Sequence, residues 1–213
     1  MIWVCAYRKW AKKVYYETSH KINSRLIESR IQLKQLAPSF KDGDKIIFIG
    51  WSWTLPTRLI NKFECICMHP SPLPKYRGGS PIQHQIINGE TTSAVTYFKM
   101  TKDLDAGPII FQEPFSLAGN LDNVLSQIVD VAMSGLIFIA NGKYKYTPQD
   151  KAYSTTYKRR KPEQSEIKHI DFKHSTAKDL YNKVRALQDP YPNAFVVCGD
   201  GKKLFLKITD YEK

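Results

Sequence analysis

The sequence predicts an α/β fold, in which helices cover a mostly parallel sheet and a small helix-plus-hairpin extension follows. Short apolar runs of the kind found in buried strands alternate with stretches of helical spacing, and the clearest run is residues 45–50 (KIIFIG). Residues 123–140 are apolar on almost every side, which is typical of a helix buried against a sheet. Strands that alternate with helices pair mainly in parallel, because each helix returns the chain across the sheet.

The chain before residue 45 is expected to contain one strand and two helices. Residues 2–6 are short and apolar, as in a buried strand. Residues 9–17 and 22–36 place apolar side chains three and four positions apart among mixed charges, which is the spacing of an amphipathic helix. The basic side chains of these two stretches then lie on solvated helix faces, with a nucleic-acid groove as the alternative.

The middle of the chain supplies the rest of the predicted sheet and its helices. Its apolar runs predict strands at 65–68, 94–100 and 109–111. Its helices are expected at 59–63, 82–88 and 123–140. Residues 70–81 are rich in Pro and Gly, which predicts a rigid loop that a ligand can approach closely.

The composition changes near residue 148. Residues 148–162 include the basic run KRRKP and are expected to form an exposed connector. The remaining sequence predicts a helix and a two-stranded hairpin, at 175–187, 195–198 and 203–208. We therefore expect one domain at 1–147, and a linker with a small C-terminal subdomain at 148–213.

The net charge and the cysteine spacing limit the classes of binding partner and the cellular compartment that we expect. There are 32 Lys and Arg against 20 Asp and Glu, and this net charge of +12 favours a nucleic acid, a nucleotide or an acidic membrane face. The longest nearly apolar stretch, 131–140, is short of the roughly 18 residues that a membrane span needs, and no secretory signal is recognisable. The cysteines lack the spacing of a disulfide framework or a zinc site, so we expect free thiols, no metal, no membrane and a cytoplasmic location.

Candidate catalytic residues follow two of the predicted strands. In open α/β sheets, ligands bind beyond the carboxyl ends of the strands, and parallel neighbours would bring such loops to one edge. His69 follows the 65–68 strand and is a candidate general base, because imidazole exchanges protons near neutrality. Asp105, beyond the 94–100 strand, is a candidate to orient the imidazole and to stabilise its charged form. Taken singly, each residue is more often structural.

The two segments together are much more specific. Residues 69–78 (HPSPLPKYRG) and 105–109 (DAGPI) resemble the folate-dependent formyltransferase family. That family includes glycinamide ribonucleotide transformylase, methionyl-tRNA formyltransferase and the sugar N-formyltransferases. Its pattern is Asn-x-His-Pro-Ser-Leu-Leu-Pro-x-Tyr-Arg-Gly, followed by Asp-x-Gly-Pro-Ile. The similarity is strong over 45–111 and weaker over 157–195.

The resemblance implies a Rossmann-like catalytic domain at 1–147, with a shortened amino-terminal part, and 10-formyltetrahydrofolate as the formyl donor. A primary amine would attack the formyl carbon, with His69 transferring the proton and Asp105 as its partner. The residues that match the family's folate site are Trp51, Ser52, Trp53, Gly79, Thr101, Lys102, Asp103, Leu104 and Asp105. Indole rings suit this role, because they can flank a flat pterin.

One position departs from the family pattern. Where the family has Asn, two residues before the histidine, this chain has Cys67. The family's Asn helps to stabilise the developing oxyanion, and a thiol is a weak hydrogen-bond donor. Either another group fills this role, or the chain is a weak enzyme or a non-catalytic relative that binds folate or a nucleotide sugar. A nucleophilic Cys67 is a further alternative, although the apolar run before it predicts a buried thiol.

The favoured acceptor is the amine of a nucleotide-linked amino sugar, which would make the chain a sugar N-formyltransferase. Lys75, Tyr76 and Arg77 are expected to bind it, because the cations would offset a diphosphate and the ring would pack on a base or sugar. Methionyl-tRNA and glycinamide ribonucleotide are the alternative acceptors. The tRNA is less favoured, since the sequence after residue 195 predicts one hairpin and not a full barrel. The sequence leaves open whether the chain forms a homodimer.

Overall fold

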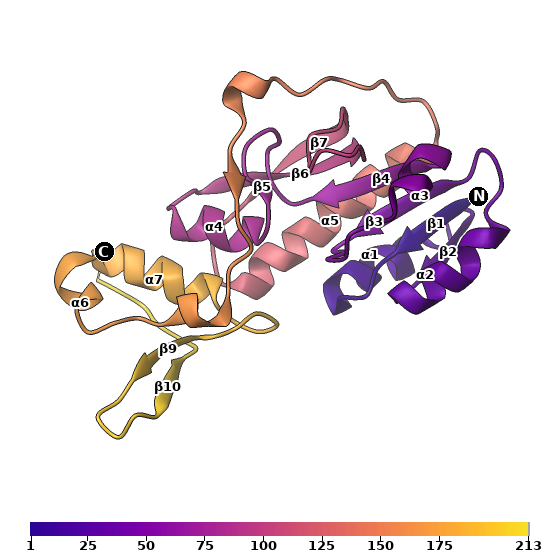
Figure 1. Cartoon of the computed structure of the whole chain (residues 1–213). Helices are drawn as coiled ribbons and strands as arrows, with labels where there is room; N and C mark the ends of the chain where they lie inside the picture. The colour runs from indigo at the N-terminus through magenta and orange to yellow at the C-terminus, as the bar shows by residue number, and fades with distance from the viewer. Residues whose placement is uncertain (213) are drawn as a thin grey trace.

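The computed structural model describes residues 1–212 and contains a central sheet of six strands (Figure 1). The order across the sheet is β2-β1-β3-β4-β6-β7, with bounds Ser24–Ile27, Ile2–Cys5, Lys45–Ile49, Glu64–His69, Thr92–Lys99 and Ile109–Ser116. The first four strands of this order are parallel, which confirms the predicted mostly parallel α/β fold. The central strands β1 and β3 are buried on both faces, which explains their continuous apolar sequences.

The last two strands, β6 and β7, run antiparallel to their neighbours. The expectation that parallel strands bring all the candidate loops to one edge is therefore wrong for β6. Lys99, at the carboxyl end of β6, pairs with Ile66 in the middle of β4, and the next residue, Met100, donates its N–H to the carbonyl oxygen of Cys65 at 2.8 Å. The loop after β6 must therefore fold back along β4 before Asp105 can reach the end of that strand.

Helices cover both faces of the sheet (Figure 1). The four that do so are α1, α2, α3 and α5, with bounds Lys9–Thr18, Arg30–Leu36, Thr57–Lys62 and Leu121–Ala140. α1 and α5 pack against each other and share one hydrophobic core, whereas α2 and α3 cover a second core on the opposite face. Neighbours along a strand divide between the two cores, as Ile47 and Phe48 do, because successive side chains point to opposite faces.

The stretch 22–36 is not the single helix that its spacing predicts. It forms the edge strand β2 and then α2, which begins after Ser29, whose side chain accepts the N–H of Gln32 at 3.1 Å. β2 pairs in parallel with β1 along its whole length. Hydrogen bonding to β1 therefore overrides the local helical spacing. The preference of a segment for a strand depends on packing against neighbouring strands as well as on its own sequence.

The apolar region at α5 is longer than the 131–140 stretch noted in the sequence. α5 has 20 residues and a mean hydropathy of 1.6 over its most apolar window, so it is long and apolar enough to cross a membrane by length and composition. Val124, Ile128 and Leu136 are completely buried, and α5 packs against α1 and β7. Its apolar composition is thus accounted for by its place in the core.

The connector and the C-terminal subdomain flank the sheet. Their elements and the neighbouring short ones are β5, α4, β8, α6, α7, β9 and β10, with bounds Arg77–Gly78, Pro81–Ile87, Thr156–Tyr157, Asp171–His174, Ala177–Ala186, Ala194–Val197 and Lys203–Leu206. Short 3-10 helices lie at Ala37–Ser39, Lys151–Tyr153 and Pro162–Ser165. The predicted C-terminal helix and antiparallel hairpin are confirmed. Figure 1 shows the connector (orange) passing over the sheet domain before it returns through β8, which pairs with β5.

Candidate active site

A cavity of about 720 Å³ lies on one face of the sheet, where β3, β4 and β6 adjoin. Its floor includes Phe48, Cys67 and Phe98, which are direct cross-strand partners and therefore share one face of the sheet. His69 also lines the cavity, two residues beyond Cys67 on β4, and alternate residues of a strand point the same way. The strand geometry thus brings the predicted base and the unusual cysteine to the same cavity.

His69 is 6% exposed, and both ring nitrogens face polar groups. Nε2 lies 2.8 Å from the carbonyl oxygen of Tyr76, and Nδ1 lies 3.7 Å from Oδ2 of Asp105. A carbonyl oxygen only accepts hydrogen bonds, so Nε2 carries the proton of the neutral ring. The distance from Nδ1 to Asp105 exceeds that of a hydrogen bond. The contact with Tyr76 therefore favours the tautomer with the proton on Nε2, while Asp105 faces Nδ1 without a hydrogen bond.

Asp105 is placed by its loop so that its carboxylate faces the imidazole. Its Oδ2 accepts the N–H of Gly78 at 2.8 Å, and its side chain is only 12% exposed. Its backbone φ of 50° lies in the left-handed region, which few residues other than glycine adopt. The loop therefore places a carboxylate that is largely sheltered from solvent beside Nδ1 of His69.

Cys67 is half-buried in the cavity floor. Burial, and then the negative charge of Asp105, raise the pKa of the Cys67 thiol well above its usual value. The thiolate form that nucleophilic attack requires is therefore disfavoured. Its sulfur contacts the carbonyl oxygen of the next residue at 3.6 Å. The geometry supports a cavity-lining thiol more than a nucleophile.

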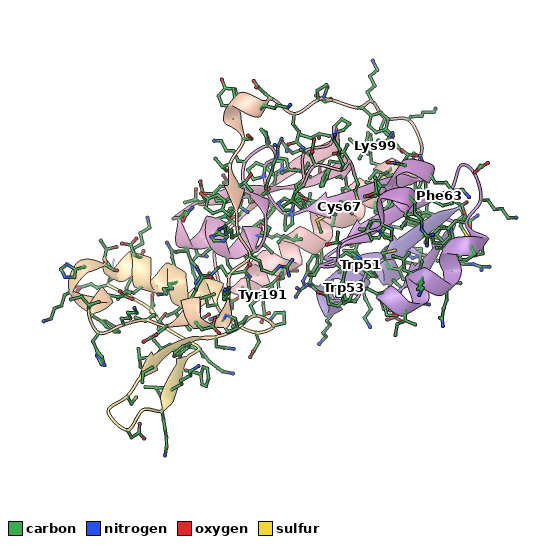
Figure 2. The ribbon with its side chains drawn as sticks, viewed as in Figure 1. Trp51, Trp53, Phe63, Cys67, Lys99 and Tyr191 are labelled. Atoms are coloured by element: carbon green, nitrogen blue, oxygen red, sulfur yellow. The ribbon has the colours of Figure 1, made fainter. Side chains whose placement is uncertain are left out.

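Trp51, Ser52 and Trp53 form one wall of the cavity, just beyond the end of β3. Figure 2 shows Trp51 and Trp53 close to each other. The two indoles meet edge to face with their ring centroids 4.8 Å apart. The ring of Tyr7 packs 4.4 Å from that of Trp53, and its hydroxyl donates to Ser52 at 2.8 Å. Nε1 of Trp51 is buried without a partner. Both indoles therefore pack against Tyr7, and Nε1 of Trp51 has no hydrogen-bond partner within the protein.

The loop after β6 supplies the rim of the cavity. The predicted residues Thr101, Lys102, Asp103 and Leu104 all line it and are exposed. Leu104 is 67% exposed, which leaves an apolar side chain in solvent beside the cavity mouth. An exposed apolar side chain at the edge of a cavity is suited to contact with a ligand.

The residues expected to bind the acceptor do not line the cavity. Tyr76 is buried and stacks on Tyr157 with a centroid distance of 4.9 Å. Arg77 donates both Nε and Nη2 to the side chain of Gln149. Lys75 is exposed. The role in acceptor binding assigned to these three residues is therefore not supported by their positions.

Gly79 also lies outside the lining, and its size is required by packing. A Cβ at Gly79 would lie 2.4 Å from Cα of Arg159. At Gly78, where φ is 94°, a Cβ would lie 2.2 Å from the carbonyl oxygen of Tyr157. The two glycines let the connector cross the catalytic loop, and that crossing brings Arg159 to the cavity.

Seven residues that sequence reasoning missed line the same cavity. They are Arg8, Trp10, Gln83, Arg159, Arg160, Lys161 and Tyr191. Arg8 lies just beyond the end of β1, so the rule that identified Trp51 could also have identified it. Residues 159–161 were interpreted as part of an exposed connector, and only the tertiary contacts bring them to the site. Figure 2 shows Tyr191 where the C-terminal subdomain meets the sheet domain.

Three of these residues carry buried donors. Nε of Arg160 makes no hydrogen bond, whereas the side-chain donors of Gln83 and Trp10 face the hydroxyl of Tyr191. Burial lowers the pKa of Arg160 and raises that of Tyr191, against the opposing effects of Arg8, Gln83 and Trp10 around the tyrosine. Leaving a buried donor unpaired costs about 1–3 kcal/mol, so a ligand with acceptor oxygens would be stabilised here. Within residues 1–212, no three His, Cys, Asp or Glu side chains are grouped as a metal site would require.

Two family models match this chain. One, described as formyl transferase, matches residues 13–127, and the other, described as formyl transferase, C-terminal domain, matches residues 163–213. The chain belongs to the formyl transferase family. The resemblance inferred from the motifs at 69–78 and 105–109 is therefore confirmed.

Curated relatives of this chain include methionyl-tRNA formyltransferases. That of Lactiplantibacillus plantarum is 34% identical over 174 residues, which cover 78% of this chain and 54% of the relative. That of Ehrlichia ruminantium is 29% identical over 193 residues, which cover 87% of this chain and 58% of the relative. The chain thus spans about half the length of the curated relatives it matches.

Solved structures share the fold over almost the whole chain. A methionyl-tRNA formyltransferase from Clostridium thermocellum is 26% identical, with a TM-score of 0.78 and 96% of each chain covered. A Mycobacterium tuberculosis protein described as a likely sugar N-formyltransferase is 21% identical, with a TM-score of 0.81 and coverage of 100% of this chain and 99% of that one. HypX from Aquifex aeolicus, solved with tetrahydrofolic acid, is 21% identical, with a TM-score of 0.76. The match covers 96% of this chain and 37% of HypX. The fold is common to proteins described with different acceptors and does not choose among them.

Proposed function

We propose that this formyl transferase moves a formyl group from 10-formyltetrahydrofolate to a primary amine. The observation that carries the proposal is the placement of His69 and Asp105 beside each other on one cavity, in a chain of this family. We assign the chemistry to residues 1–147. Residues 148–213 would support it, chiefly through the connector residues that reach the cavity.

His69 is proposed as the group that receives the proton of the attacking amine. Nε2 is already protonated and bound to Tyr76, so Nδ1 carries the lone pair that can accept it. The amine nitrogen bonds to the formyl carbon as its proton moves to Nδ1. The bond from that carbon to the donor nitrogen then breaks, and His69 returns the proton to the donor nitrogen. Asp105 stabilises the imidazolium between these two transfers.

We place the folate against Trp51, Ser52 and Trp53 and under the rim loop at 101–105. The unpaired Nε1 of Trp51 and the indole surfaces fit a flat ring with a polar edge. When bound, 10-formyltetrahydrofolate supplies the formyl group. Titration with a tetrahydrofolate analogue should quench the protein fluorescence, and Trp51→Phe should lose more of that quenching than Trp53→Phe. Identical quenching in both variants and the wild type would contradict the placement.

For the acceptor, we propose a nucleotide-linked amino sugar. Arg8, Arg160 and Gln83 line the cavity from three separate segments, and Nε of Arg160 is a buried donor without a partner. Cations and amide donors of this kind bind phosphate oxygens through short, charge-assisted hydrogen bonds. A diphosphate needs only a few such groups, and these three line the same cavity as His69.

Methionyl-tRNA is the second candidate acceptor. It is favoured by the two curated relatives described above, methionyl-tRNA formyltransferases at 34% and 29% identity. A tRNA that contacts many phosphates would lose affinity steeply with salt, whereas a diphosphate would lose it gently.

The experiment is formyl transfer to a panel of nucleotide amino sugars and to methionyl-tRNA, at equal concentration and two salt concentrations, read by mass spectrometry. We expect a product 28 Da heavier, about the mass of the added CO group, from at least one amino sugar. Efficient transfer to the tRNA alone would establish the second candidate. Transfer to no amine, by a folded protein that binds folate, would refute the proposed function.

A further inference from the structure

Gln149 links the two segments that hold the carboxylate of Asp105. It is half-buried in the connector, among exposed neighbours. Its Nε2 donates to the carbonyl oxygens of Asp105 and Gly107, at 2.9 and 2.7 Å. Its Oε1 accepts from Nε and Nη2 of Arg77, at 3.1 and 2.6 Å. The amide thus uses both of its N–H donors and both oxygen lone pairs, which leaves it one orientation.

The hydrogen bonds of Gln149 to the Asp105 loop and those to Arg77 both help to position the carboxylate of Asp105. On one side, Gln149 holds the main chain of Asp105 itself. On the other, it holds Arg77, which directly precedes the Gly78 N–H that binds Oδ2 of Asp105 at 2.8 Å. The relative position of these two segments therefore sets the distance of 3.7 Å from Asp105 to His69.

The Asp105 loop needs such support, and Gln149 is well anchored to give it. The left-handed backbone of Asp105 is strained and persists only where its surroundings hold it. Gln149 follows Thr147, which exchanges two backbone hydrogen bonds of 2.7 and 2.8 Å with Ile109 at the start of β7. The amide therefore reaches Asp105 from a point tied to the sheet.

We propose that Gln149 is a positioning residue that holds Asp105 at its working distance from His69. Its effect on turnover rests on the proposed formyl transfer, whereas its effect on the position of Asp105 is a property of the protein without substrate. The two effects are measured separately.

The turnover test compares Gln149→Ala with wild type and with Gln127→Ala. Gln127 is a matched control, because its amide also binds backbone, at the N–H of Ser116, but lies outside the cavity lining. We expect kcat of Gln149→Ala to fall by about 10- to 100-fold, since a small misplacement of a reacting group has effects of this size. KM for both substrates should change by less than about threefold, because no binding contact is removed. Gln127→Ala should behave like wild type.

A second variant, Gln149→Glu, separates the hydrogen bonds to Arg77 from those to the Asp105 loop. It keeps an acceptor for Arg77 but turns an oxygen toward the carbonyl oxygens of Asp105 and Gly107, which repel it. We expect it to lose kcat as Gln149→Ala does. Because Gln149→Glu retains the bonds to Arg77, it can be used to measure both kcat and the Gly78 amide signal if Gln149→Ala does not fold.

The substrate-free readout is the amide proton of Gly78, which reports its hydrogen bond to Asp105. In ¹⁵N-resolved spectra, both Gln149 variants should move this signal upfield and speed its hydrogen exchange by at least about tenfold. Asp105→Ala marks the position of the signal without the bond. An unchanged Gly78 signal in both variants, or an unchanged kcat in an active enzyme, would overturn the positioning role. A shifted Gly78 signal in a protein that formylates no amine would support the positioning role and refute only the proposed function.

Discussion

The carbonyl oxygen of Tyr76 lies 2.8 Å from Nε2 of His69, and this contact determines which imidazole nitrogen is available for chemistry. Tyr76 itself has a left-handed backbone with φ of 58°, and its ring is stacked on Tyr157. The ring stacking and the loop hold the carbonyl in place. A residue that the sequence suggested for substrate binding thus contributes through its main chain, and Nδ1 of His69 is left to exchange protons.

Replacing His69 should abolish turnover while leaving the fold intact. His69→Ala removes one buried hydrogen bond, so we expect a loss of about 2–4 °C in Tm and a fall of about 10²–10⁴ in kcat. His84→Ala is the matched control, because Nε2 of His84 also binds a carbonyl oxygen, that of Lys158 at 2.9 Å, outside the cavity lining. Its turnover should stay near that of wild type. Comparable activity in the two variants would exclude His69 as the proton acceptor.

The thiol of Cys67 should be unreactive in the native protein. Its pKa is raised by burial and by Asp105, so little thiolate forms near pH 8, whereas Cys198 is exposed. Iodoacetamide should label Cys198 quickly and Cys67 only after unfolding, as peptide mass spectrometry will show. Cys67→Asn should retain or raise turnover, because an amide is the better donor to an oxyanion. A formyl group trapped on Cys67 would show that it is the nucleophile after all.

Gly79 should tolerate no side chain. A methyl group at Gly79 would meet the backbone of Arg159 at 2.4 Å, which forces the connector away from the loop. We expect Gly79→Ala to lower the free energy of unfolding by about 1–3 kcal/mol in urea titrations. Gly199→Ala, where nothing lies within 4 Å of the added carbon, should change it by less than about 0.5 kcal/mol. Equal stabilities for the two variants would contradict the close crossing.

Glu64 should contribute stability that depends on pH. It accepts hydrogen bonds from Lys45, Tyr144 and Tyr146 at the start of β4. Burial acts to raise the pKa of Glu64, but these bonds and the charge of Lys45 hold it below its usual value. Such a group stabilises the protein above its unfolded pKa of about 4.3, and the stabilisation is lost as the pH falls through the lowered folded value.

The variant that tests this is Glu64→Gln. At pH 7 it should lower the free energy of unfolding by about 1–3 kcal/mol, and its difference from wild type should shrink below about pH 4. Urea unfolding over a pH series measures both. Glu28→Gln removes a solvent-exposed ion pair and should cost less than about 1 kcal/mol. A difference that stays constant from neutral to acid pH would contradict the ionised role of Glu64.

Local patterns predict most clearly the elements with long apolar sequences. The apolar run of β3, which is buried on both faces, and α5, whose apolar residues pack into the core, were predicted from the sequence. β2 was not, because an edge strand has half-exposed residues whose spacing also suits a helix. The direction of β6 was not predicted either, since local spacing carries no information about which way a strand runs beside its partner.

The same distinction holds at the candidate site. His69 and Asp105 were identified from their motifs, and the loops at 51–53 and 101–104 from strand ends and family resemblance. Arg160 and Gln149 were missed because each belongs to a connector whose sequence is polar and unpatterned. Their partners lie tens of residues away, so only the folded chain shows that they face the cavity or the Asp105 loop.

By itself, the sequence determined the family, the class of fold and the residues of the catalytic loop, because these depend on side-chain chemistry and spacing along the chain. Only the tertiary structure decided that Tyr76 sets the tautomer of His69, that Gln149 holds Asp105, and that Lys75 and Arg77 lie away from the cavity. Those relations depend on main-chain carbonyl groups, which every residue possesses, and on a side chain far away in the sequence. Their positions are fixed by distant packing, and for that reason no local pattern of residues can reveal them.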